Sequence, residues 1–440
     1  MDDTRIAVIG LGYVGLPLAL SLAEAGRLVT GVDSSPTRIQ ELRAGKSPID
    51  DVEDGRLRAA LEGGHLAVSG TEDADLAGAD VLFVCVPTPL TDAKEPDLAP
   101  LISAATMIQR QLRRGQLVIL QSTTYPGTTN GPFRETLEKS GLVAGTDFEL
   151  AFAPERVNPG DPGSASRATP RLVGGTTAHA TERAAAVLRS INDQVMVLSS
   201  PDVAELAKLL ENVFRNVNIA LVNQLALLCE RMGLDVWEVI DAASTKPFGY
   251  MRFLPGPGVG GHCIPVDPYY LSWRARQFEF VDRFVELAGD INLAMPRHVV
   301  ELAAEALNDR GQALRGARVG ILGVAFKPNV RDPRNSPAAG VIGGLVARGA
   351  NVSYHDPHVA RFRAADGTAL ESVPLAALVD GSDLLVVVTA HRAIDWRVVY
   401  GRGALVVDTV NSSRGMEVRE RQVLRLGAGW NPASAAATRA

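Results

Sequence analysis

The residue with the clearest chemical potential is a cysteine in a stretch where cysteines have no ordinary structural use. Cys263 lies in "GPGVGGHCIPVDPYYL", residues 256–271, behind a run of glycines that offers neither an apolar wall nor a disulfide partner. Asp267 and Pro268 follow shortly afterwards and are typical of the start of a helix. The spacing therefore predicts a thiol on a loop that is pinned just ahead of a helix.

The other two cysteines have plain surroundings. Cys85 lies in the apolar run "VLFVCVP" and Cys229 in the helical pattern "LALLCERMG", where a thiol packs as a small hydrophobic group. An odd number of cysteines, with no set of cysteines and histidines at metal-ligand spacing, excludes a disulfide framework and a zinc site. His262 is expected to point away from Cys263, because neighbouring side chains of an extended loop alternate in direction.

A glycine-rich turn near the start of the chain indicates a dinucleotide. Gly10, Gly12 and Gly15 form the G-x-G-x-x-G pattern directly after the strand "IAVI" and open a helix. Such glycines let the backbone approach a pyrophosphate at a helix N-terminus. Asp33, at the tip of the next predicted strand, is the expected acceptor for a ribose hydroxyl and would repel a 2′-phosphate. NAD is therefore predicted in preference to NADP, and a tight turn without a ligand is the alternative.

A third set of polar residues lies on a helix. Lys208, Asn212 and Arg215 are spaced i, i+4 and i+7, so they share one face of the helical pattern at 201–233. The plain interpretation is that these three residues form a polar stripe exposed to solvent. Apolar residues cover most of the rest of the helix surface, however, which favours a stripe that lines an internal cleft. Only 6 of the 44 basic residues are lysines, so a lysine here suggests that a compact, titratable ammonium group is needed.

Two stretches of the chain have the element order that would position these residues. Residues 5–35 and 317–357 both read as strand, glycine turn, helix and strand. Further buried strands follow each one, "ADVLFVCVPTP" and "GQLVILQSTT" in the first, "SDLLVVVTAHR" and "GALVVDTVNSS" in the second. The predicted fold class is α/β, with two Rossmann-like doubly wound domains joined by a long central helix and a helical middle region.

The predicted domain boundaries follow from this organisation. They are 1–200 for an NAD-binding domain, 201–312 for a central helical region, 315–425 for the second Rossmann-like domain and 426–440 for a disordered tail.

Composition sets the outer limits on function. The chain has 440 residues, 46% of them hydrophobic, and a net charge of -6, which fits a globular protein of two or three domains. The acidic balance argues against nucleic acid and anionic membranes as partners. No apolar run is long enough to span a bilayer, and the first residues do not resemble a signal peptide, so a cytoplasmic location is expected.

Several motifs in register resemble a known family. They are "GLGYVGLP", "VPTP", "STTYPGT", "PER", "AKLLEN", "GPGVGGHC" and "FKPNVRDPRNSP". Over residues 5 to 415 the chain is similar to the UDP-sugar 6-dehydrogenases of the UDP-glucose/GDP-mannose dehydrogenase family. The resemblance implies oxidation of a sugar C6 hydroxymethyl group to a carboxylate with two NAD. It also implies a nucleotide held by the second Rossmann domain, and a homodimer formed through the central helix.

The resemblance assigns catalytic roles. Cys263 looks like the nucleophile that adds to an aldehyde intermediate, and Lys208 and Asn212 would donate to the developing oxyanion. Glu155 of "PER" would activate water for thioester hydrolysis, with Thr123 positioning that water. Asp267 would assist proton transfer through a water. The residues alone also allow a loop salt bridge for Glu155 and a helix cap for Asp267.

The resemblance also implies the binding residues. At NAD it places Gly10, Gly12, Tyr13, Val14, Gly15, Asp33, Arg38, Thr88, Thr123 and Arg334. At the nucleotide sugar it places Arg156, Val157, Lys208, Asn212, Arg215, Gly260 and Lys327. Lys327 follows the strand "VGILGVAFK" at the carboxyl edge where open α/β sheets bind ligands, although a surface lysine is the alternative.

Differences from the UDP-glucose enzymes indicate which branch of the family this chain resembles. Pro159 stands where those enzymes have a glutamate, Val266 where they have a lysine, and Pro247 and Val410 also differ. Together with "PERVNPG" and "HCIPVDPYYL", they resemble the N-acetylhexosamine branch, and UDP-N-acetylglucosamine is the favoured substrate. UDP-N-acetylmannosamine and UDP-glucose stay as alternatives. A two-electron hydroxyacid-type dehydrogenase and a non-catalytic NAD-binding protein are remote alternatives, because neither needs Cys263.

Overall fold

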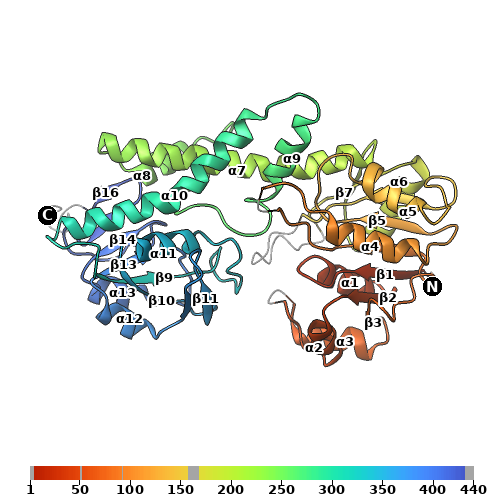
Figure 1. Ribbon diagram of the computed structural model, residues 1–440, viewed down its shortest axis with the longest axis horizontal. Coiled ribbons are helices and arrows are strands. Elements are labelled where there is room, and N and C mark those ends of the chain that lie inside the picture. The colour runs from red at the N-terminus through yellow and green to blue at the C-terminus, as the bar shows by residue number, and fades with distance from the viewer. Residues whose placement is uncertain (1–3, 50–51, 92, 157–167, 432–440) are drawn as a thin grey trace. The chain divides into compact units, whose positions relative to one another are not determined.

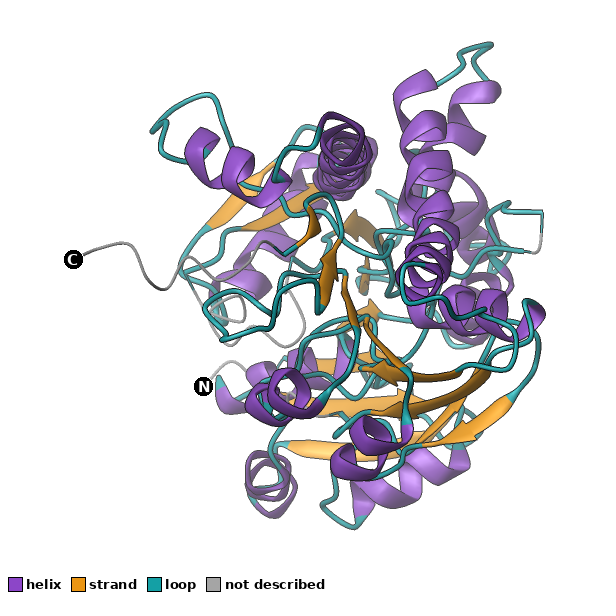
Figure 2. Ribbon diagram, turned by 90° about the vertical axis from the view of Figure 1, so that its left-hand side faces the viewer, coloured by secondary structure: helices purple, strands orange, loops and turns teal. Residues whose placement is uncertain are grey.

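The computed structural model describes residues 4–49, 52–91, 93–156 and 168–431. The chain divides into two compact units, which we call the first unit (residues 1–212 with 269–281) and the second unit (residues 213–268 with 282–440). Each unit contains a mostly parallel sheet flanked by helices (Figure 1, Figure 2). This arrangement confirms the predicted fold class, whereas the predicted domain boundaries stay predictions.

The sheet of the first unit has the strand order β3-β2-β1-β4-β5-β6-β7-β8. Every neighbouring pair is parallel except β6 and β7. The strands are β1 (Arg5–Ile9), β2 (Leu28–Asp33), β3 (Leu66–Gly70), β4 (Val81–Val84), β5 (Leu117–Leu120), β6 (Glu149–Phe152), β7 (Arg171–Gly175) and β8 (Val195–Val197). The strand order reverses between β1 and β4, and ligands of open α/β sheets bind outside the carboxyl ends at such a point.

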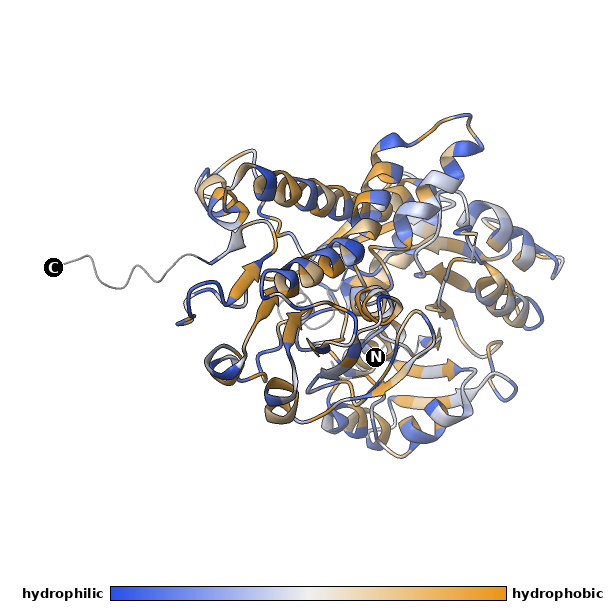
Figure 3. Cartoon of the chain, turned by 60° about the vertical axis from the view of Figure 1, so that its left-hand side comes forward, coloured by the Kyte–Doolittle hydropathy of each residue, from blue (hydrophilic) through white to orange (hydrophobic). Residues whose placement is uncertain are grey.

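Helices cover both faces of this sheet because its strands are apolar on both sides. Ile6 and Val8 of β1 pack into one core cluster with α1 (Gly15–Glu24), whereas Ala7 and Ile9 pack into another with α4 (Ala99–Gln109). The remaining helices are α2 (Pro36–Arg43), α3 (Asp54–Glu62), the π-helix η1 (Thr129–Phe133), α5 (Arg134–Glu138), α6 (Ala178–Arg189) and α9 (Asp267–Arg276). Figure 3 shows the apolar residues gathered in the strands.

The long helix predicted at 201–233 is α7 (Pro201–Met232). In the second unit, Cys229 of α7 is 2% exposed and packs with α8 (Val236–Ala243), as a small hydrophobic group would. The other long helix is α10 (Arg283–Asn308). Among the helices in the described part of the chain, none is long and apolar enough to cross a membrane.

The second unit repeats the architecture of the first with the strand order β10-β9-β13-β14-β15-β16. Its strands are β9 (Arg318–Leu322), β10 (Asn351–His355), β13 (Leu384–Val387), β14 (Val406–Asp408), β15 (Val423–Arg425) and β16 (Gly429–Trp430), beside a hairpin of β11 (Arg361–Arg363) and β12 (Ala369–Glu371). The helices α11 (Pro337–Ala347), α12 (Leu375–Gly381) and α13 (Trp396–Arg402) complete it. The strand order again reverses, here between β9 and β13.

The C-terminal segment differs in part from its prediction. A disordered tail was predicted from residue 426, but β16 pairs antiparallel with β15 and Leu426 is fully buried. The indole of Trp237 also donates to the carbonyl oxygen of Leu426 at 2.9 Å. Residues 426–431 are therefore folded, because their apolar side chains complete the core, and residues 432–440 lie outside the described residues.

Candidate active site

The predicted dinucleotide turn lies between β1 and α1, where the strand order reverses. Gly10 has φ +93°, and a Cβ there would lie 2.6 Å from the carbonyl oxygen of Cys85. A Cβ at Gly15 would lie 1.8 Å from the carbonyl oxygen of Gly10, so only glycine lets α1 start this close to the strand. At Gly12 a Cβ would meet nothing within 4 Å, and α1 has no side-chain cap. Open space before an uncapped helix N-terminus fits a pyrophosphate, and Tyr13 and Val14 lie half-buried in the same turn.

Asp33 lies beside this turn at the end of β2. Its side chain is 5% exposed and accepts the backbone N–H of Leu11 and of Ser35, both at 2.9 Å. The guanidinium of Arg38, on the following helix, lies 3.1 Å from the same carboxylate. Asp33 is therefore held next to the turn, and Arg38 is brought to it.

Thr88 and Thr123 lie at the carboxyl edge of the same sheet, after β4 and β5. The hydroxyl of Thr88 donates to the carbonyl oxygen of Thr123 at 2.8 Å. Behind them, the buried Tyr270 of α9 donates its hydroxyl to the carbonyl oxygens of Thr88 and Pro89. The two threonines are thus joined to each other and supported by α9.

Glu155 lies just beyond the end of β6 and is held from several sides. The guanidinium of Arg171 forms an ion pair with its Oε2, and both side chains are nearly buried, at 13% and 12% exposed. Gln121 donates to the same oxygen at 3.3 Å, and Oε1 accepts the backbone N–H of Arg156 at 2.8 Å. The salt bridge that the sequence left open for Glu155 is therefore present, with Arg171 as its partner.

The sheet topology explains why Arg171 reaches Glu155. The antiparallel register of β6 and β7 pairs Phe152 with Gly174, and continuing that register places Glu155 opposite Arg171. Arg171 is held in turn by Asn192, whose Oδ1 accepts its Nε–H at 3.0 Å. Sequence reasoning missed Arg171, because nothing in a single sequence shows that β7 runs antiparallel to β6.

Arg156, predicted at the nucleotide sugar, faces α7. Its guanidinium lies 2.6 Å from Glu211 of that helix and donates to the carbonyl oxygen of Pro170 at 2.9 Å. Val157, predicted at the same ligand, and Pro159 lie outside the described residues.

The three predicted polar residues of α7 do not share one environment. Lys208 and Asn212 are buried, at 8% and 9% exposed, as expected for an inward-facing stripe. Arg215 is exposed. In that part of α7 the buried residues are Val213, Asn216 and Ala220, so Arg215 lies off the buried face of the helix.

A buried carboxyl group on the same helix was also missed. Glu205 is 0% exposed and accepts the N–H of Gly127 at 2.7 Å, the N–H of Thr129 at 2.9 Å and the hydroxyl of Thr129 at 2.6 Å. Burial raises the pKa of Glu205 to about 7, against the lowering effect of these hydrogen bonds. Glu205 therefore fixes the loop that follows Thr123.

In the second unit, the glycines before Cys263 serve close packing. A Cβ at Gly260 would lie 2.8 Å from the carbonyl oxygen of Asn335 and 2.9 Å from Cβ of Phe326. Gly261 has φ +91°, and its Cβ would lie 2.9 Å from the ring of Phe326. The loop thus lies directly on the segment that follows β9, and this contact requires glycine.

Hydrogen bonds pin the cysteine loop at both ends. The N–H of Gly261 donates to the carbonyl oxygen of Arg334 at 3.2 Å, and its carbonyl accepts from the side-chain amide of Asn335 at 2.9 Å. The carbonyl of Cys263 accepts the N–H of Asp267 at 2.8 Å. Asp267 is buried and is the first residue of α9, so the predicted loop ahead of a helix is present.

His262 differs from its prediction. Its Nδ1 lies 3.1 Å from Sγ of Cys263, although adjacent side chains were expected to point apart. That expectation holds for extended backbone, whereas the chain bends at residues 261–263. The bend turns both side chains to one side and makes His262 a functional candidate that sequence reasoning set aside.

Two further predicted residues follow β9 in this unit. Arg334 pairs with the buried Asp332, with its Nη2 2.6 Å from Oδ2. Lys327 is half-buried, next to Phe326. A cavity of about 410 Å³ adjoins the loop and is lined by Val259, Asn335 and residues of α10 and α11.

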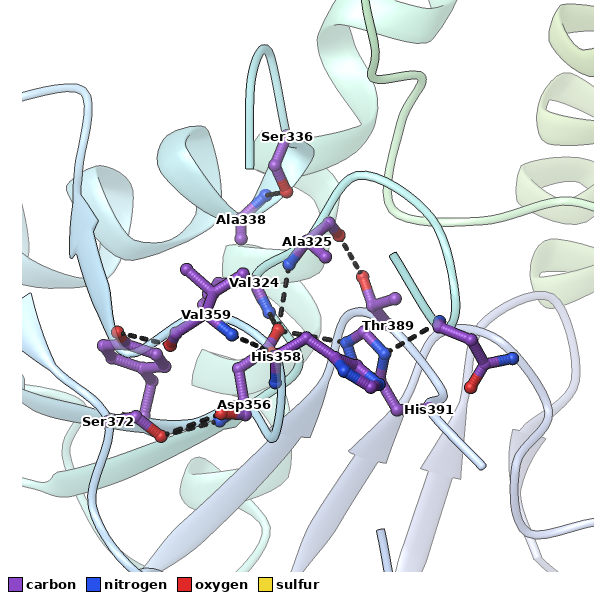
Figure 4. Close-up of polar contacts among 12 residues, drawn as sticks. Val324, Ala325, Ser336, Ala338, Asp356, His358, Val359, Ser372, Thr389 and His391 are labelled. Atoms are coloured by element: carbon purple, nitrogen blue, oxygen red, sulfur yellow. Dashed lines mark hydrogen bonds and ion pairs between the residues drawn. The ribbon is translucent and has the colours of Figure 1, made fainter. Parts of the chain in front are cut away.

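The second sheet has its own counterpart of Asp33, and a buried histidine binds its carboxylate. Asp356 ends β10 and accepts the N–H groups of Val324 and Ala325 at 2.7 and 3.0 Å, as Asp33 accepts that of Leu11 (Figure 4). The fully buried His391 lies 3.0 Å from the same oxygen. Burial alone would raise the pKa of Asp356, but His391 and the backbone donors bring it to about 2. The side-chain partner of Asp356 is therefore a buried histidine, whereas that of Asp33 is the partly exposed Arg38.

The fold and the glycine turn define a dinucleotide-dependent oxidoreductase with a second Rossmann-like domain for its substrate. The chain belongs to the UDP-glucose/GDP-mannose dehydrogenase family. The NAD binding domain of this family matches residues 4–192, its central domain residues 202–294 and its UDP binding domain residues 320–414. The protein is an NAD-dependent UDP-sugar dehydrogenase.

Proteins similar to this chain carry two different sugar names. UDP-N-acetyl-D-glucosamine 6-dehydrogenase of Pseudomonas aeruginosa is 39% identical over 82% of this chain and 84% of its own length. UDP-N-acetyl-D-mannosamine dehydrogenase of Pyrococcus horikoshii is 38% identical over 89% of this chain and 91% of its own. A solved structure of UDP-D-ManNAc dehydrogenase from Pyrococcus horikoshii superposes with a TM-score of 0.88 at 34% identity, covering 97% of this chain and 100% of that one.

Proposed function

We propose that this protein oxidises C6 of UDP-N-acetylglucosamine to the carboxylate of UDP-N-acetylglucosaminuronate, using two NAD and a covalent intermediate on Cys263. The observation that carries the four-electron reaction is the pinned loop that holds Cys263 beside His262 and ahead of α9. A two-electron hydroxyacid-type dehydrogenase needs no such thiol. UDP-N-acetylmannosamine and UDP-glucose are the alternative substrates, and the names of the relatives support an N-acetylhexosamine.

The proposed steps use side chains of this chain around a bound NAD. The dinucleotide is held by the turn at Gly10 and Gly12, by Asp33 and by Arg38, and it supplies the hydride acceptor for both oxidations. After the first oxidation, Sγ of Cys263 adds to the C6 aldehyde and forms a thiohemiacetal, which the second oxidation converts to a thioester.

The remaining roles concern oxygen and water. Lys208 and Asn212 would donate to the oxyanion that develops on C6. Glu155 would take a proton from the hydrolytic water, with Thr123 positioning that water and Asp267 assisting proton transfer. Hydrolysis then releases the carboxylate and regenerates the thiol. Arg156, Val157, Arg215, Gly260 and Lys327 would contact the nucleotide sugar, and Arg334 the NAD.

The test of this reaction is the stoichiometry of NADH. Purified enzyme offered a limiting amount of UDP-N-acetylglucosamine should form two NADH per sugar, measured at 340 nm. One NADH per sugar would favour the hydroxyacid-type alternative, and none with any UDP-sugar would favour a binding protein without catalysis.

The loop at 246–260 is where we place sugar selection. Phe248 and Tyr250 are 71% and 39% exposed, and the Phe248 ring has Nζ of Lys246 4.8 Å from its centroid. The exposed ring surface of these residues could meet an acetamido methyl group. Phe253 instead packs on Phe214, with ring centroids 5.8 Å apart, and fixes the loop to α7. A missing acetamide would also leave its hydrogen-bonding partner unpaired. UDP-N-acetylglucosamine should therefore exceed UDP-glucose at least tenfold in kcat/KM, which corresponds to about 1.4 kcal/mol.

A Phe248→Ala variant tests this assignment. It should narrow the preference in kcat/KM for UDP-N-acetylglucosamine over UDP-glucose. Phe278→Ala, which removes a similarly exposed phenylalanine of the first unit, should leave that preference unchanged. Equal efficiency of the unmodified enzyme with both sugars would refute the selectivity and leave the cysteine chemistry standing.

We also propose a homodimer formed through α7. Leu206, Leu210, Phe214, Leu221 and Leu228 of this helix are 45 to 61% exposed. The last three recur at intervals of seven residues, as in helices that pair with a second helix. A Leu221→Glu change should convert a dimer to a monomer in light scattering, and Met251→Glu, at a 63% exposed residue outside the helix, should not. A wild-type monomer would refute the proposal.

A further inference from the structure

We propose that His262 is the proton acceptor for the thiol of Cys263 and returns that proton when the thioester is hydrolysed. The inference rests on the proposed function of Cys263 as the nucleophile. Its first support is direct contact, because Nδ1 of His262 lies 3.1 Å from Sγ of Cys263. This separation is within the range over which sulfur and an imidazole nitrogen share a hydrogen bond.

The backbone around the pair is held in a way that fixes this contact. Gly261 is hydrogen-bonded on both sides to residues 334 and 335, directly before His262. Directly after it, the carbonyl of Cys263 accepts the N–H groups of Val266 and Asp267, at 3.0 and 2.8 Å. The two residues between these anchors have little freedom, so the contact belongs to the fold of the loop.

Packing also restrains the imidazole ring itself. The ring of His262 lies edge-on to that of Phe326, with centroids 6.1 Å apart and planes at 61°. Phe326 is fixed in turn, because its N–H donates to the carbonyl oxygen of Asp332 at 2.9 Å. The imidazole of His262 therefore contacts both the ring of Phe326 and the thiol of Cys263.

The charges near the pair support a histidine that takes up a proton. Asp332 is 4% exposed. Burial alone would raise its pKa, but Arg334 and, more weakly, the charge of His262 keep it below its usual value. The other charged residues of the segment 326–336 and of the first turn of α9 are Lys327, Arg331 and Asp267. The charges of Asp332 and His262 act on each other. A negative charge favours the imidazolium, and the start of α9 just beyond Cys263 favours a thiolate.

The chemistry balances with the NAD and the water that the proposed function already uses. As Sγ of Cys263 bonds to the aldehyde carbon, the thiol proton passes to Nδ1 of His262 and the carbonyl π electrons pass to oxygen. The oxyanion then takes up one proton from solvent and becomes the thiohemiacetal hydroxyl. The second oxidation removes a hydride from C6 to NAD and the hydroxyl proton to solvent, which leaves the thioester. In hydrolysis, Glu155 takes a proton from the water that adds to the thioester carbon, the C–S bond breaks, and the departing sulfur recovers its proton from His262.

The experiment measures thiol reactivity directly, in the absence of any sugar. Cys263 is alkylated with iodoacetamide between pH 5.5 and pH 9.5, and its modification is followed by mass spectrometry of the peptide that contains it. In the wild-type protein we expect the rate at pH 7 to be about half of its maximum or more, whereas an ordinary thiol is only a few per cent thiolate at that pH.

The decisive variant is His262→Asn. Asparagine keeps a polar atom near the position of Nδ1 but cannot take up a proton, so it separates proton transfer from simple hydrogen bonding. Alkylation of Cys263 at pH 7 should fall at least tenfold and should recover at high pH. The matched control is His298→Asn, the same change at a histidine of the second unit that pairs with Glu230 at 2.9 Å, and it should leave the rate unchanged.

Two results would overturn the proposal. One is a wild-type rate at pH 7 of only a few per cent of its maximum, a measurement that needs no variant to fold. The other is a folded His262→Asn protein whose alkylation curve matches the wild type within twofold. In turnover, His262→Asn should lower kcat at least tenfold at pH 7 and change KM for the UDP-sugar less than threefold, because the loop geometry is kept.

Failure of this inference can be told apart from failure of the proposed function. If Cys263→Ala still forms the uronate, the covalent mechanism fails whatever the alkylation shows. If Cys263→Ala abolishes uronate formation and His262→Asn leaves alkylation unchanged, the mechanism stands and His262 has no part in it.

Discussion

Glu205 should make the stability of this protein depend on pH in an unusual direction. Its carboxyl group is fully buried, and burial raises its pKa from 4.5 to about 7. Because the folded state holds this proton more tightly than the unfolded chain, the stabilisation that it gives is complete below pH 4.5. It is lost as the pH rises through about 7.

The size of the effect follows from the two pKa values. Each tenfold change in proton affinity is worth about 1.4 kcal/mol. The difference between the pKa of Glu205 in the unfolded chain and in the folded protein therefore corresponds to about 3 kcal/mol of unfolding free energy. For a unit of about 200 residues, such as the first unit, that free energy corresponds to a change in Tm of roughly 6–12 °C. A Glu205→Gln variant cannot titrate, so the difference in Tm between wild type and variant should change by this amount from pH 4.5 to pH 8.

The assay is differential scanning calorimetry of both proteins across that pH range. Glu182→Gln serves as the control, because Glu182 lies on α6 and its side chain is 63% exposed. Asp202 is a second probe, since its negative charge helps to raise the pKa of Glu205. Asp202→Asn should therefore move the loss of stability to lower pH. If Tm plotted against pH gave parallel curves for the wild type and Glu205→Gln between pH 4.5 and pH 8, the reasoning would be refuted.

Other consequences concern the cofactor and the chemistry. Asp33→Asn should narrow the preference for NAD over NADP in kcat/KM, since it removes the charge that opposes a 2′-phosphate, and comparable turnover of the unmodified enzyme with NADP would contradict this role. Cys263→Ala should abolish uronate formation, and Cys229→Ala should cost about 1 kcal/mol of stability but leave turnover intact. Arg171→Met should lower kcat at least tenfold while acyl-enzyme accumulates on Cys263, seen by intact mass, because Glu155 loses its partner. Arg134→Met, which breaks a half-buried ion pair with Glu138 in the same unit, should not.

The fold was largely predictable because its elements are encoded in short runs of neighbouring residues. The apolar strand ahead of Gly10, the Pro201–Met232 helix and the second strand–turn–helix unit were all visible as local patterns of hydrophobicity and glycine. Such patterns depend on backbone geometry within one element, so they do not need the rest of the molecule. The same holds for the position of Asp33 at the end of the second strand, from which its role at the ribose is predicted.

The partners of the candidate site residues could not be predicted, because they are set by contacts between segments that are distant along the chain. Arg171 meets Glu155 only because β7 runs antiparallel to β6. Glu205 is buried only because the loop at 127–129 folds over it.

Even adjacent residues could not be placed by sequence alone. Whether His262 faces Cys263 depends on the bend that Gly261 makes against the segment after β9, and alternation along an extended chain predicted the opposite. The sequence by itself determined which elements form and which residue types can react. The tertiary structure decided their partners, because register, burial and bending result from packing over the whole domain and not from any local pattern.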